Sequence, residues 1–249
     1  MKDPHPAPGR RRTLIVIPCL NEAAALPRLI VEVREAIPSI SGEVVVVVID
    51  DGSTDGTAAR GLELGVRVVR LSRNLGIGGA VQTGLRLAFR EHFDAAVQID
   101  GDGQHPPSEV PRLLARLEQG ADLVVGSRFL DNESGFRSTA ARRLGIAWFS
   151  TLLRAAAGLS IADPTSGFRA FGPGALLLFD RVFPYDFPEP ESLAVAHVAG
   201  LRVAEQAVRM RPRQHGRSSI GKLASPYYVL KVTLGILLAV ARTHRMERP

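Results

Sequence analysis

The sequence predicts an α/β protein whose central sheet is doubly wound and mostly parallel, with helices on both faces. Two observations support this fold class. Residues 13–17 and 44–49 are continuous apolar runs rich in β-branched side chains, a pattern typical of strands buried on both faces of a parallel sheet. Helix-like stretches then alternate with strand-like ones along the first half of the chain, and such alternation produces right-handed βαβ units.

The other expected elements follow from weaker versions of the same patterns. Further strands are expected over 66–71, 95–99 and 123–126, and helices over 22–36, 54–64, 79–91 and 108–119. In the last of these helices Ser108 is a suitable N-cap, Pro111 is tolerated in the first turn, and Gly120 ends the helix. Near the end of the chain, residues 223–241 are apolar enough to predict one more helix.

The composition excludes several classes of protein. With 249 residues, 45% of them hydrophobic and 22% charged, the chain can bury a sizeable core. Cys19 is the single cysteine, which excludes a disulfide framework and a zinc site built from cysteines, and fits a reducing compartment. The start of the chain has no apolar run of the kind that a secretory signal needs. We therefore expect a cytoplasmic protein.

Positive charge is concentrated at the C-terminal end of the chain. Residues 202–249 hold ten basic and two acidic side chains, whereas the formal net charge of the whole chain is +6. A basic tail suits an anionic partner, such as a membrane surface, a phosphorylated substrate or a nucleic acid. A basic end that is simply solvated explains the same pattern.

The charge and apolar patterns divide the chain into three expected segments: a flexible arm over 1–12, a globular domain over 13–215, and a basic, apolar membrane-association segment over 216–249. The run 223–241 is close to the length of about 20 residues that spans a bilayer, but Lys231 lies in its middle. A helix lying on anionic headgroups fits better. The alternatives are a spanning helix and a helix docked on the protein's own core. A second apolar stretch, 144–161, can share the membrane surface or belong to the core.

Polar clusters follow the expected strands, at the edge where open α/β sheets bind their ligands. The first strand leads into Pro18-Cys19-Leu20-Asn21-Glu22. A dinucleotide-binding domain would have a Gly-rich turn there, so an NAD enzyme is not expected. The second strand leads into Asp50-Asp51-Gly52-Ser53, whose carboxylates can accept hydrogen bonds from a base or a ribose. The same residues also form an ordinary turn into a helix N-cap.

The strongest chemical signal follows the fourth expected strand. Asp100 and Asp102 are followed by Gln104, and these side chains offer the hard oxygen donors that Mg²⁺ or Mn²⁺ prefers. Acids at neighbouring strand ends would repel one another by about 4 kcal/mol per pair at about 4 Å and an effective dielectric of about 20, and a bound cation would offset that cost. His105, followed by two prolines, is more typical of a packing residue than of a ligand.

These motifs and Gly126-Ser127-Arg128-Phe129 occur in an order and at separations that resemble the family 2 glycosyltransferases of the GT-A fold, close to the dolichol- and polyprenyl-phosphate sugar transferases. The resemblance covers residues 13–219 and rests on the ordered set, because each motif alone is weak evidence. It implies the GT-A fold, with the expected 13–215 domain as the glycosyltransferase domain.

The resemblance also implies roles for matching residues. The donor nucleotide would be bound by Pro18, Asn21, Glu22, Asp50, Asp51 and Asp100, and the metal by Asp100, Asp102 and Gln104. The lipid phosphate would be bound by Arg128, Arg142, Arg143, Arg213, Arg217 and Ser218. Asp102, Arg213 and Glu189 would be catalytic, with Arg213 contacting phosphate through its guanidinium fork. Glu189 falls at the family's base position but lies in Glu-Pro-Glu rather than Glu-Asp, which leaves a role in loop packing open.

We therefore expect a metal-dependent, inverting glycosyltransferase, peripheral on the inner face of the cell membrane, that moves a sugar from a nucleotide donor to polyprenyl phosphate for envelope polysaccharide or glycan modification. A UDP-sugar is the favoured donor. The alternatives are a GDP-mannose-dependent mannosyltransferase and a transferase to a saccharide hydroxyl. A small membrane protein is a possible further partner. A scaffold without turnover is disfavoured by the intact acidic motif, and nucleic-acid binding by the lack of aromatic residues interleaved with the basic ones.

Overall fold

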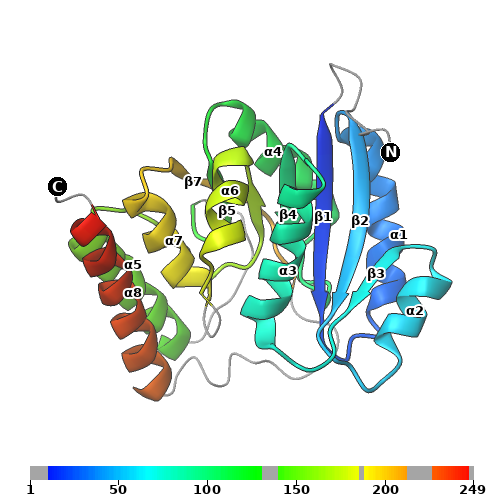
Figure 1. The fold of residues 1–249 in the computed structure, drawn as a ribbon, viewed down its shortest axis with the longest axis horizontal. Coiled ribbons are helices and arrows are strands. Elements are labelled where there is room, and N and C mark those ends of the chain that lie inside the picture. The colour runs from blue at the N-terminus through cyan, green and yellow to red at the C-terminus, as the bar shows by residue number, and fades with distance from the viewer. Residues whose placement is uncertain (1–10, 131–139, 185–187, 212–225, 247–249) are drawn as a thin grey trace.

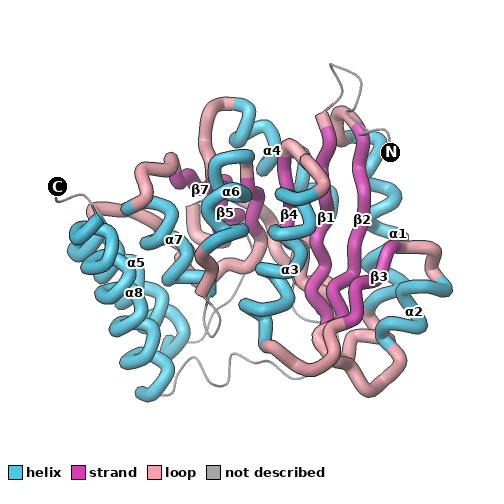
Figure 2. The backbone as a smooth tube through the Cα atoms, in the orientation of Figure 1, coloured by secondary structure: helices cyan, strands magenta, loops and turns pink. Residues whose placement is uncertain are grey.

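The computed structural model describes residues 11–130, 140–184, 188–211 and 226–246. In that part of the chain a seven-stranded sheet has the order β3-β2-β1-β4-β6-β5-β7 (Figures 1 and 2). The strands are β1 (Arg12–Cys19), β2 (Glu43–Asp50), β3 (Arg67–Arg70), β4 (Ala95–Gln98), β5 (Leu123–Ser127), β6 (Arg169–Phe171) and β7 (Val203–Ala207). The helices are α1 (Leu26–Ala36), α2 (Thr57–Glu63), α3 (Gly76–Arg90), α4 (Val110–Glu118), α5 (Ala140–Ala157), α6 (Pro173–Arg181), α7 (Pro188–Val198) and α8 (Pro226–Met246). This is the expected α/β class, a mostly parallel sheet with flanking helices.

The sheet is parallel except at β6, which runs antiparallel to β4 on one side and to β5 on the other. Arg169 of β6 therefore lies beside Gln98 of β4 and Val125 of β5. The sequence gives no strong signal for this three-residue strand, because its apolar run is too short for a period to be recognised. Its position brings the segment before residue 169 back to the edge where β4 ends.

Each face of the sheet has its own hydrophobic core. Along β1, Leu14 and Val16 face a core formed with α3, α5, α6, α7 and α8, while Ile15 and Ile17 face a core formed with α1 and α4. All four side chains are fully buried, as expected for a central parallel strand. Helix α3 packs tightly on β1 at Gly84. A Cβ at this position would lie only 2.2 Å from the Val16 side chain, so the close approach requires a glycine.

The expected strands and helices are present with shifted ends. The helix expected over 22–36 begins at Leu26, and the one expected over 79–91 begins at Gly76. Ser108 is not an N-cap, which corrects the sequence prediction: α4 begins at Val110 and makes no side-chain cap hydrogen bond. The cause is the preceding 3₁₀ turn, Pro107–Glu109, which starts after the extended Pro106 and encloses Ser108.

Helix α8 is docked on the body of the protein, beside α5 and α7 (Figure 1). Tyr228, Val232, Ile236 and Val240 recur every four residues and are buried in the first core. The helix thus buries one stripe in the core, while large apolar side chains such as Leu230, Leu234 and Leu238 remain exposed on its other side. Across the described residues, no helix combines the length and apolarity that crossing a bilayer would require. The segment boundary expected at 215/216 lies outside the described residues.

Candidate active site

The loops after β1 and β2 are joined into one structure at the edge where both strands end. The Asn21 N–H donates to Ser53 Oγ at 2.9 Å, and the Asn21 side-chain oxygen accepts from the Thr54 N–H at 2.9 Å. Asn21 has a φ of 57°, a left-handed conformation that Asn tolerates better than most residues. Asn21, which is predicted to bind the nucleotide, therefore holds the two loops together in this structure.

Asp55 adds a second connection between these loops. Its carboxylate accepts from the Ala23 N–H at 3.0 Å and from the N–H and hydroxyl of Thr57. Partial burial acts to raise the pKa of Asp55, but these hydrogen bonds outweigh it and hold the pKa below the ordinary 3.8. The carboxylate is thus stabilised in its charged form near the start of α1.

The acids that end β2 are buried at the same edge. Asp50 Oδ1 accepts from the Ser53 N–H at 3.1 Å, while its buried Oδ2 has no hydrogen bond and lies 3.4 Å from Arg70 Nε. Asp51 accepts from the Leu75 N–H at 2.7 Å. Burial raises the pKa of Asp51 although the N–H groups of Leu75 and Gly76 lower it. An orphaned buried carboxylate oxygen is a suitable acceptor for a ligand hydroxyl or N–H.

The loop before α3 also belongs to this region, although none of its residues is among those predicted from the sequence. The Asp51–Leu75 hydrogen bond ties the loop to β2. A Cβ on Gly52 would lie 2.9 Å from the Asn74 nitrogen, and Gly52 has a φ of 73°. A glycine is therefore required on two grounds. The run Arg73-Asn74-Leu75-Gly76 could have indicated this loop in the sequence. It leads into the N-terminus of α3, and a helix N-terminus favours anions.

The acidic turn, which we define as residues 100–104 after β4, lies against both β1 and the segment before β6. The Gly101 N–H donates to Pro18 O at 3.3 Å, and a Cβ on Gly101 would lie 2.6 Å from Cys19 Sγ. On the other side, a Cβ on Gly167 would lie 3.0 Å from Asp100 Oδ2. Burial raises the pKa of the Cys19 thiol, and the nearby acids raise it further. The predicted residues Pro18 and Asp100 are thus brought together across neighbouring strands.

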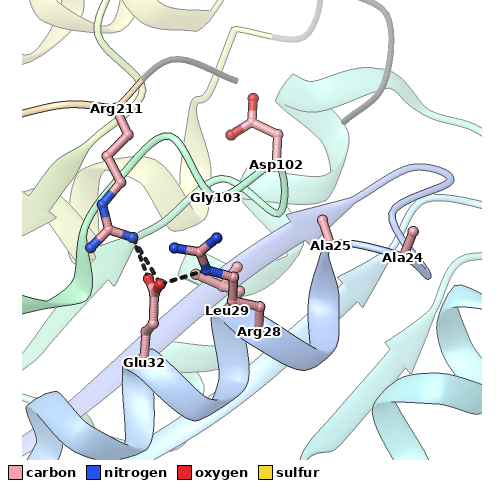
Figure 3. Close-up of a pocket in the computed structure, with 8 residues that line it drawn as sticks. All are labelled: Ala24, Ala25, Arg28, Leu29, Glu32, Asp102, Gly103 and Arg211. Atoms are coloured by element: carbon pink, nitrogen blue, oxygen red, sulfur yellow. Dashed lines mark hydrogen bonds and ion pairs between the residues drawn. The ribbon is translucent and has the colours of Figure 1, made fainter. Parts of the chain in front are cut away.

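Asp102 and Gly103 face the start of α1 across a small pocket (Figure 3). Asp102 Oδ1 accepts from the Gln104 N–H at 2.9 Å, and the Asp102 carboxylate points away from Glu32. The Arg211 N–H donates to Gln104 O at 3.0 Å, and Arg211 Nη1 bonds both oxygens of Glu32 at 2.7 and 2.8 Å. Arg28 shares the same carboxylate.

The acidic turn fits a hard divalent cation. Asp100 and Asp102 supply carboxylates and Gln104 an amide oxygen, the ligand types that Mg²⁺ and Mn²⁺ prefer. Among the described residues no group of three or more His, Cys, Asp or Glu side chains that could hold a metal was found. Mg²⁺ is usually held by one or two carboxylates together with substrate phosphates, so this donor set suits a cation that arrives with a diphosphate.

Arg128, predicted to bind phosphate, is buried in a bidentate ion pair. Its Nε and Nη2 donate to the two oxygens of Asp163 at 2.6 and 2.7 Å, and Nη2 also reaches Thr165 Oγ1 at 3.1 Å. Glu205 of β7 then accepts from the Asp163 N–H at 2.9 Å. In this structure Arg128 therefore fixes the loop before β6 to the end of β5.

Glu189 lies in the first turn of α7, beside Arg169, a second buried arginine that is not among the predicted site residues. Arg169 donates to Ser192 Oγ and to the main-chain oxygens of Ser166, Pro164 and Glu189. Burial lowers the pKa of Arg169 to about 10, against the carboxylates of Glu189, Asp163 and Asp100. Desolvation raises the pKa of Glu189, against the charge of Arg169.

Helix α8 also reaches the surroundings of Arg169 and Glu189. Burial raises the pKa of Tyr228, and the charge of Glu189 raises it further. The Tyr228 ring packs edge-on against Phe149 of α5, with centroids 5.6 Å apart. A residue of the C-terminal helix therefore contributes to the surroundings of Glu189, which no local sequence signal indicates.

Several predicted acceptor residues are not described. Arg213, Arg217 and Ser218 lie outside the described residues, as does the side chain of Arg142. Arg143 is exposed on α5. Their predicted roles in binding a lipid phosphate stay predictions.

The chain matches the family model described as glycosyl transferase family 2 over residues 14–176. It is 36% identical over 177 residues to a polyprenol monophosphomannose synthase from Mycolicibacterium smegmatis, covering 68% of this chain and 65% of that protein. It is 32% identical over 219 residues to an undecaprenyl-phosphate mannosyltransferase from Micrococcus luteus, covering 84% of this chain and 87% of that protein. The match to the mycobacterial relative thus spans slightly less than two thirds of it.

Among solved structures, the chain resembles glucosyl-3-phosphoglycerate synthase from Mycobacterium tuberculosis in complex with Mn²⁺, uridine diphosphate and phosphoglyceric acid. The TM-score is 0.69 and the identity 25%, and the match covers 93% of this chain and 79% of that one. A complex of the same synthase with phosphoglyceric acid gives a TM-score of 0.68, with 24% identity and 94% and 81% coverage. These neighbours have the GT-A fold, which agrees with the predicted fold class.

Proposed function

The chain belongs to glycosyl transferase family 2, and from this membership we propose that it transfers a sugar from a nucleoside diphosphate donor to a polyprenyl phosphate with the help of a divalent cation. It is a glycosyltransferase with a GT-A fold. The observation that carries the proposal is the acidic turn of Asp100 and Asp102, which lies at the sheet edge shared with the loops after β1 and β2.

The donor side follows from the charges at this edge. Asp50 and Asp51 would accept hydrogen bonds from the nucleoside, and Asp100, Asp102 and Gln104 would hold Mg²⁺ or Mn²⁺. The cation would stabilise the charge that develops on the departing diphosphate. A solved neighbour carries Mn²⁺ and uridine diphosphate, which supports the use of both in proteins of this fold.

The acceptor side rests on the relatives' names and on the chemistry of a phosphate. By name, one relative is a polyprenol monophosphomannose synthase and the other an undecaprenyl-phosphate mannosyltransferase. A phosphate monoester is largely ionised at neutral pH because its second pKa is near 6, so it attacks without a strong general base. Glu189, whose pKa is raised by desolvation, would then orient the reactants through Arg169 and the start of α7.

A mannosyl transfer is the second candidate reaction. Both relatives carry mannose in their names, which favours GDP-mannose as the donor, whereas the solved neighbours were crystallised with UDP or UDP-glucose. To decide between these donors, the protein would be incubated with polyprenyl phosphate, Mg²⁺ or Mn²⁺, and one of three donors: UDP-glucose, UDP-N-acetylglucosamine or GDP-mannose. The lipid product would be identified by mass spectrometry. We expect one donor to give a polyprenyl-phosphate monosaccharide. The proposal would be refuted if no donor gave this lipid product while a parallel incubation with a saccharide acceptor showed transfer to its hydroxyl.

The membrane side of the proposal concerns α5 and α8, which lie side by side (Figure 1). Both expose large apolar side chains, and Trp148 of α5 donates to Thr233 of α8 at 3.1 Å. The exposed apolar residues of these two helices are Leu144, Trp148, Tyr227, Leu230, Leu234, Leu237 and Leu238. A helix pair that exposes an apolar face of this kind, with the basic residues Arg143 and Arg154 exposed on α5, would lie on the inner membrane face rather than cross it.

Vesicle flotation tests the membrane contact. We expect the double variant Leu234→Ser/Leu238→Ser to bind anionic phosphatidylglycerol vesicles more weakly than the unchanged protein, because about half of each side chain is exposed on α8 (50% and 55%). Leu62→Ser, at a site 64% exposed on α2, is the matched control and should bind as before. Equal binding by all three proteins would count against this face.

A further inference from the structure

His105 is buried directly beneath the acidic turn. Its residue is only 5% exposed, and its ring is stacked on Phe168 with centroids 5.0 Å apart and planes 9° from parallel. Phe168 is itself fully buried, and its main-chain oxygen accepts from the Gly126 N–H at 2.8 Å. The imidazole therefore lies on a rigid platform between β5 and β6.

Both nitrogens of the ring face Asp100, and Nδ1 makes a hydrogen bond with it. The Asp100 N–H donates to His105 Nδ1 at 3.1 Å. Since Nδ1 accepts, the neutral ring carries its proton on Nε2, which lies 3.8 Å from Asp100 Oδ2. One imidazole thus faces both the main chain and the carboxylate of the same residue.

Asp100 is confined from two further directions. The Gln98 side chain donates to Asp100 Oδ1 at 3.0 Å. Gly167 also leaves so little space that a Cβ there would lie 3.0 Å from Asp100 Oδ2. The carboxylate therefore lies in a slot formed by Gln98, His105 and Gly167, and of these side chains the imidazole alone also fixes the main chain.

We propose that His105 is a positioning residue for the acidic turn: through Nδ1 it fixes the main chain of Asp100, and with it the carboxylate that faces the cation and the diphosphate. This inference rests on the proposed function, because it assigns the turn to the metal and donor. Groups that orient a metal ligand typically alter metal affinity or activity by about 10–100-fold when they are removed.

Two substitutions separate the hydrogen bond from the packing. His105→Phe keeps a flat ring to stack on Phe168 but removes the acceptor. His105→Asn loses the ring, while its side-chain oxygen can take the place of Nδ1 as an acceptor. If His105 acts through packing alone, His105→Phe should perturb the Asp100 amide and metal binding less than His105→Asn does. If His105 is a positioning residue, His105→Asn should perturb them less.

The first measurement needs neither metal nor substrate. Hydrogen exchange of the Asp100 amide, followed by NMR in the metal-free full-length protein, should be slow in the unchanged protein and in His105→Asn, and clearly faster in His105→Phe. Faster exchange in Asn than in Phe would overturn the proposal.

The second measurement is Mn²⁺ binding in the presence of UDP, followed by electron paramagnetic resonance. We expect His105→Phe to bind about tenfold more weakly or worse, and His105→Asn to recover much of that affinity. Equal Mn²⁺ affinity in the Phe variant and the unchanged protein would also overturn the proposal. If the unchanged protein bound no Mn²⁺ with any nucleotide, the proposed function would fail, while the amide exchange would still decide how His105 holds Asp100.

Discussion

The proposed donor half of the site, at the ends of β1, β2 and β4, and the proposed acceptor half, around β6 and α7, hold their charged groups in different ways. After β1 and β2, carboxylates are held by main-chain N–H groups and hydroxyls of nearby loops, as Asp51 is by Leu75 and Asp55 by Ala23. Around β6 and α7, buried arginines bond to side chains and main-chain oxygens: Arg128 to Asp163, and Arg169 to Ser192. Both arrangements join loops, but the first leaves carboxylates at the sheet edge where we propose that the donor binds, whereas in the second the charged groups are buried arginines.

This difference follows from the direction of the strands. In the donor half β1, β2 and β4 run parallel, so their carboxyl ends meet at one edge and each short motif arrives there directly. In the acceptor half β6 runs against its neighbours. Loops from distant parts of the chain must therefore be joined, and an arginine with five donors is suited to joining several acceptors.

Removing the central arginine of the acceptor half should have the largest effect on stability. Arg169→Met leaves the oxygens of Ser192, Ser166 and Pro164 without their buried donor, and breaking such a network typically costs about 3–5 kcal/mol. Urea unfolding would measure the loss. Arg181→Met, at an exposed position that ends α6, should change the free energy of unfolding by less than about 0.5 kcal/mol. Equal losses in both variants would remove the contrast between the halves.

Asp102→Ala tests the donor half, where we expect loss of activity rather than of fold. Without this carboxylate the cation and diphosphate lose a preorganised contact, and kcat/KM for sugar transfer should fall by about 10²–10³-fold. Melting temperature and circular dichroism should stay close to those of the unchanged protein. Glu63→Ala, at an exposed acid of α2, is the control. Undiminished transfer by Asp102→Ala would refute the assignment of the turn.

Asp55→Asn tests whether a hydrogen-bonded acid of the donor loops contributes to stability. Because the folded pKa lies below the ordinary 3.8, the charged form stabilises the fold above that pH, and the stabilisation is lost as the pH falls through the folded pKa. The exposed carboxylate is screened by solvent, so we expect a loss of less than about 1 kcal/mol at pH 7. Thermal unfolding at pH 7 and pH 3 should show a smaller difference at pH 3. A difference that grows on acidification would contradict this view.

The Glu32–Arg211 ion pair connects the two halves and should have the smallest effect. Both side chains are partly exposed, at 19% and 37%, so Glu32→Gln should cost no more than about 1 kcal/mol. The charge-reversed pair Glu32→Arg/Arg211→Glu should recover part of the loss, measured by thermal unfolding in low salt. A double variant less stable than both single variants would show that the pair's contacts with Arg28 and Gln104 matter more than its charge.

Sequence reasoning succeeded where a feature is local. Consecutive residues reveal the apolar runs of β1 and β2, because burial on both faces of the sheet requires them. They also reveal the acids that follow β2 and β4, because parallel strands end at the same edge of the sheet. It failed for Ser108, where a 3₁₀ turn begins at Pro107. It also left Arg169, Tyr228 and Arg211 out of the site residues, since their partners Ser192, Glu189 and Glu32 are distant in sequence.

The amino-acid sequence by itself determined the fold class, the parallel strands and the identity of the acidic turn, because each depends on periodicity and residue type over a short stretch. Only the tertiary structure decided that β6 runs antiparallel between β4 and β5 and that α8 docks on the core through Tyr228 and its neighbours. It alone placed His105 under Asp100. The physical reason is that these contacts satisfy buried polar groups and apolar faces between elements far apart in the chain, where many partners are compatible with the sequence and packing selects one.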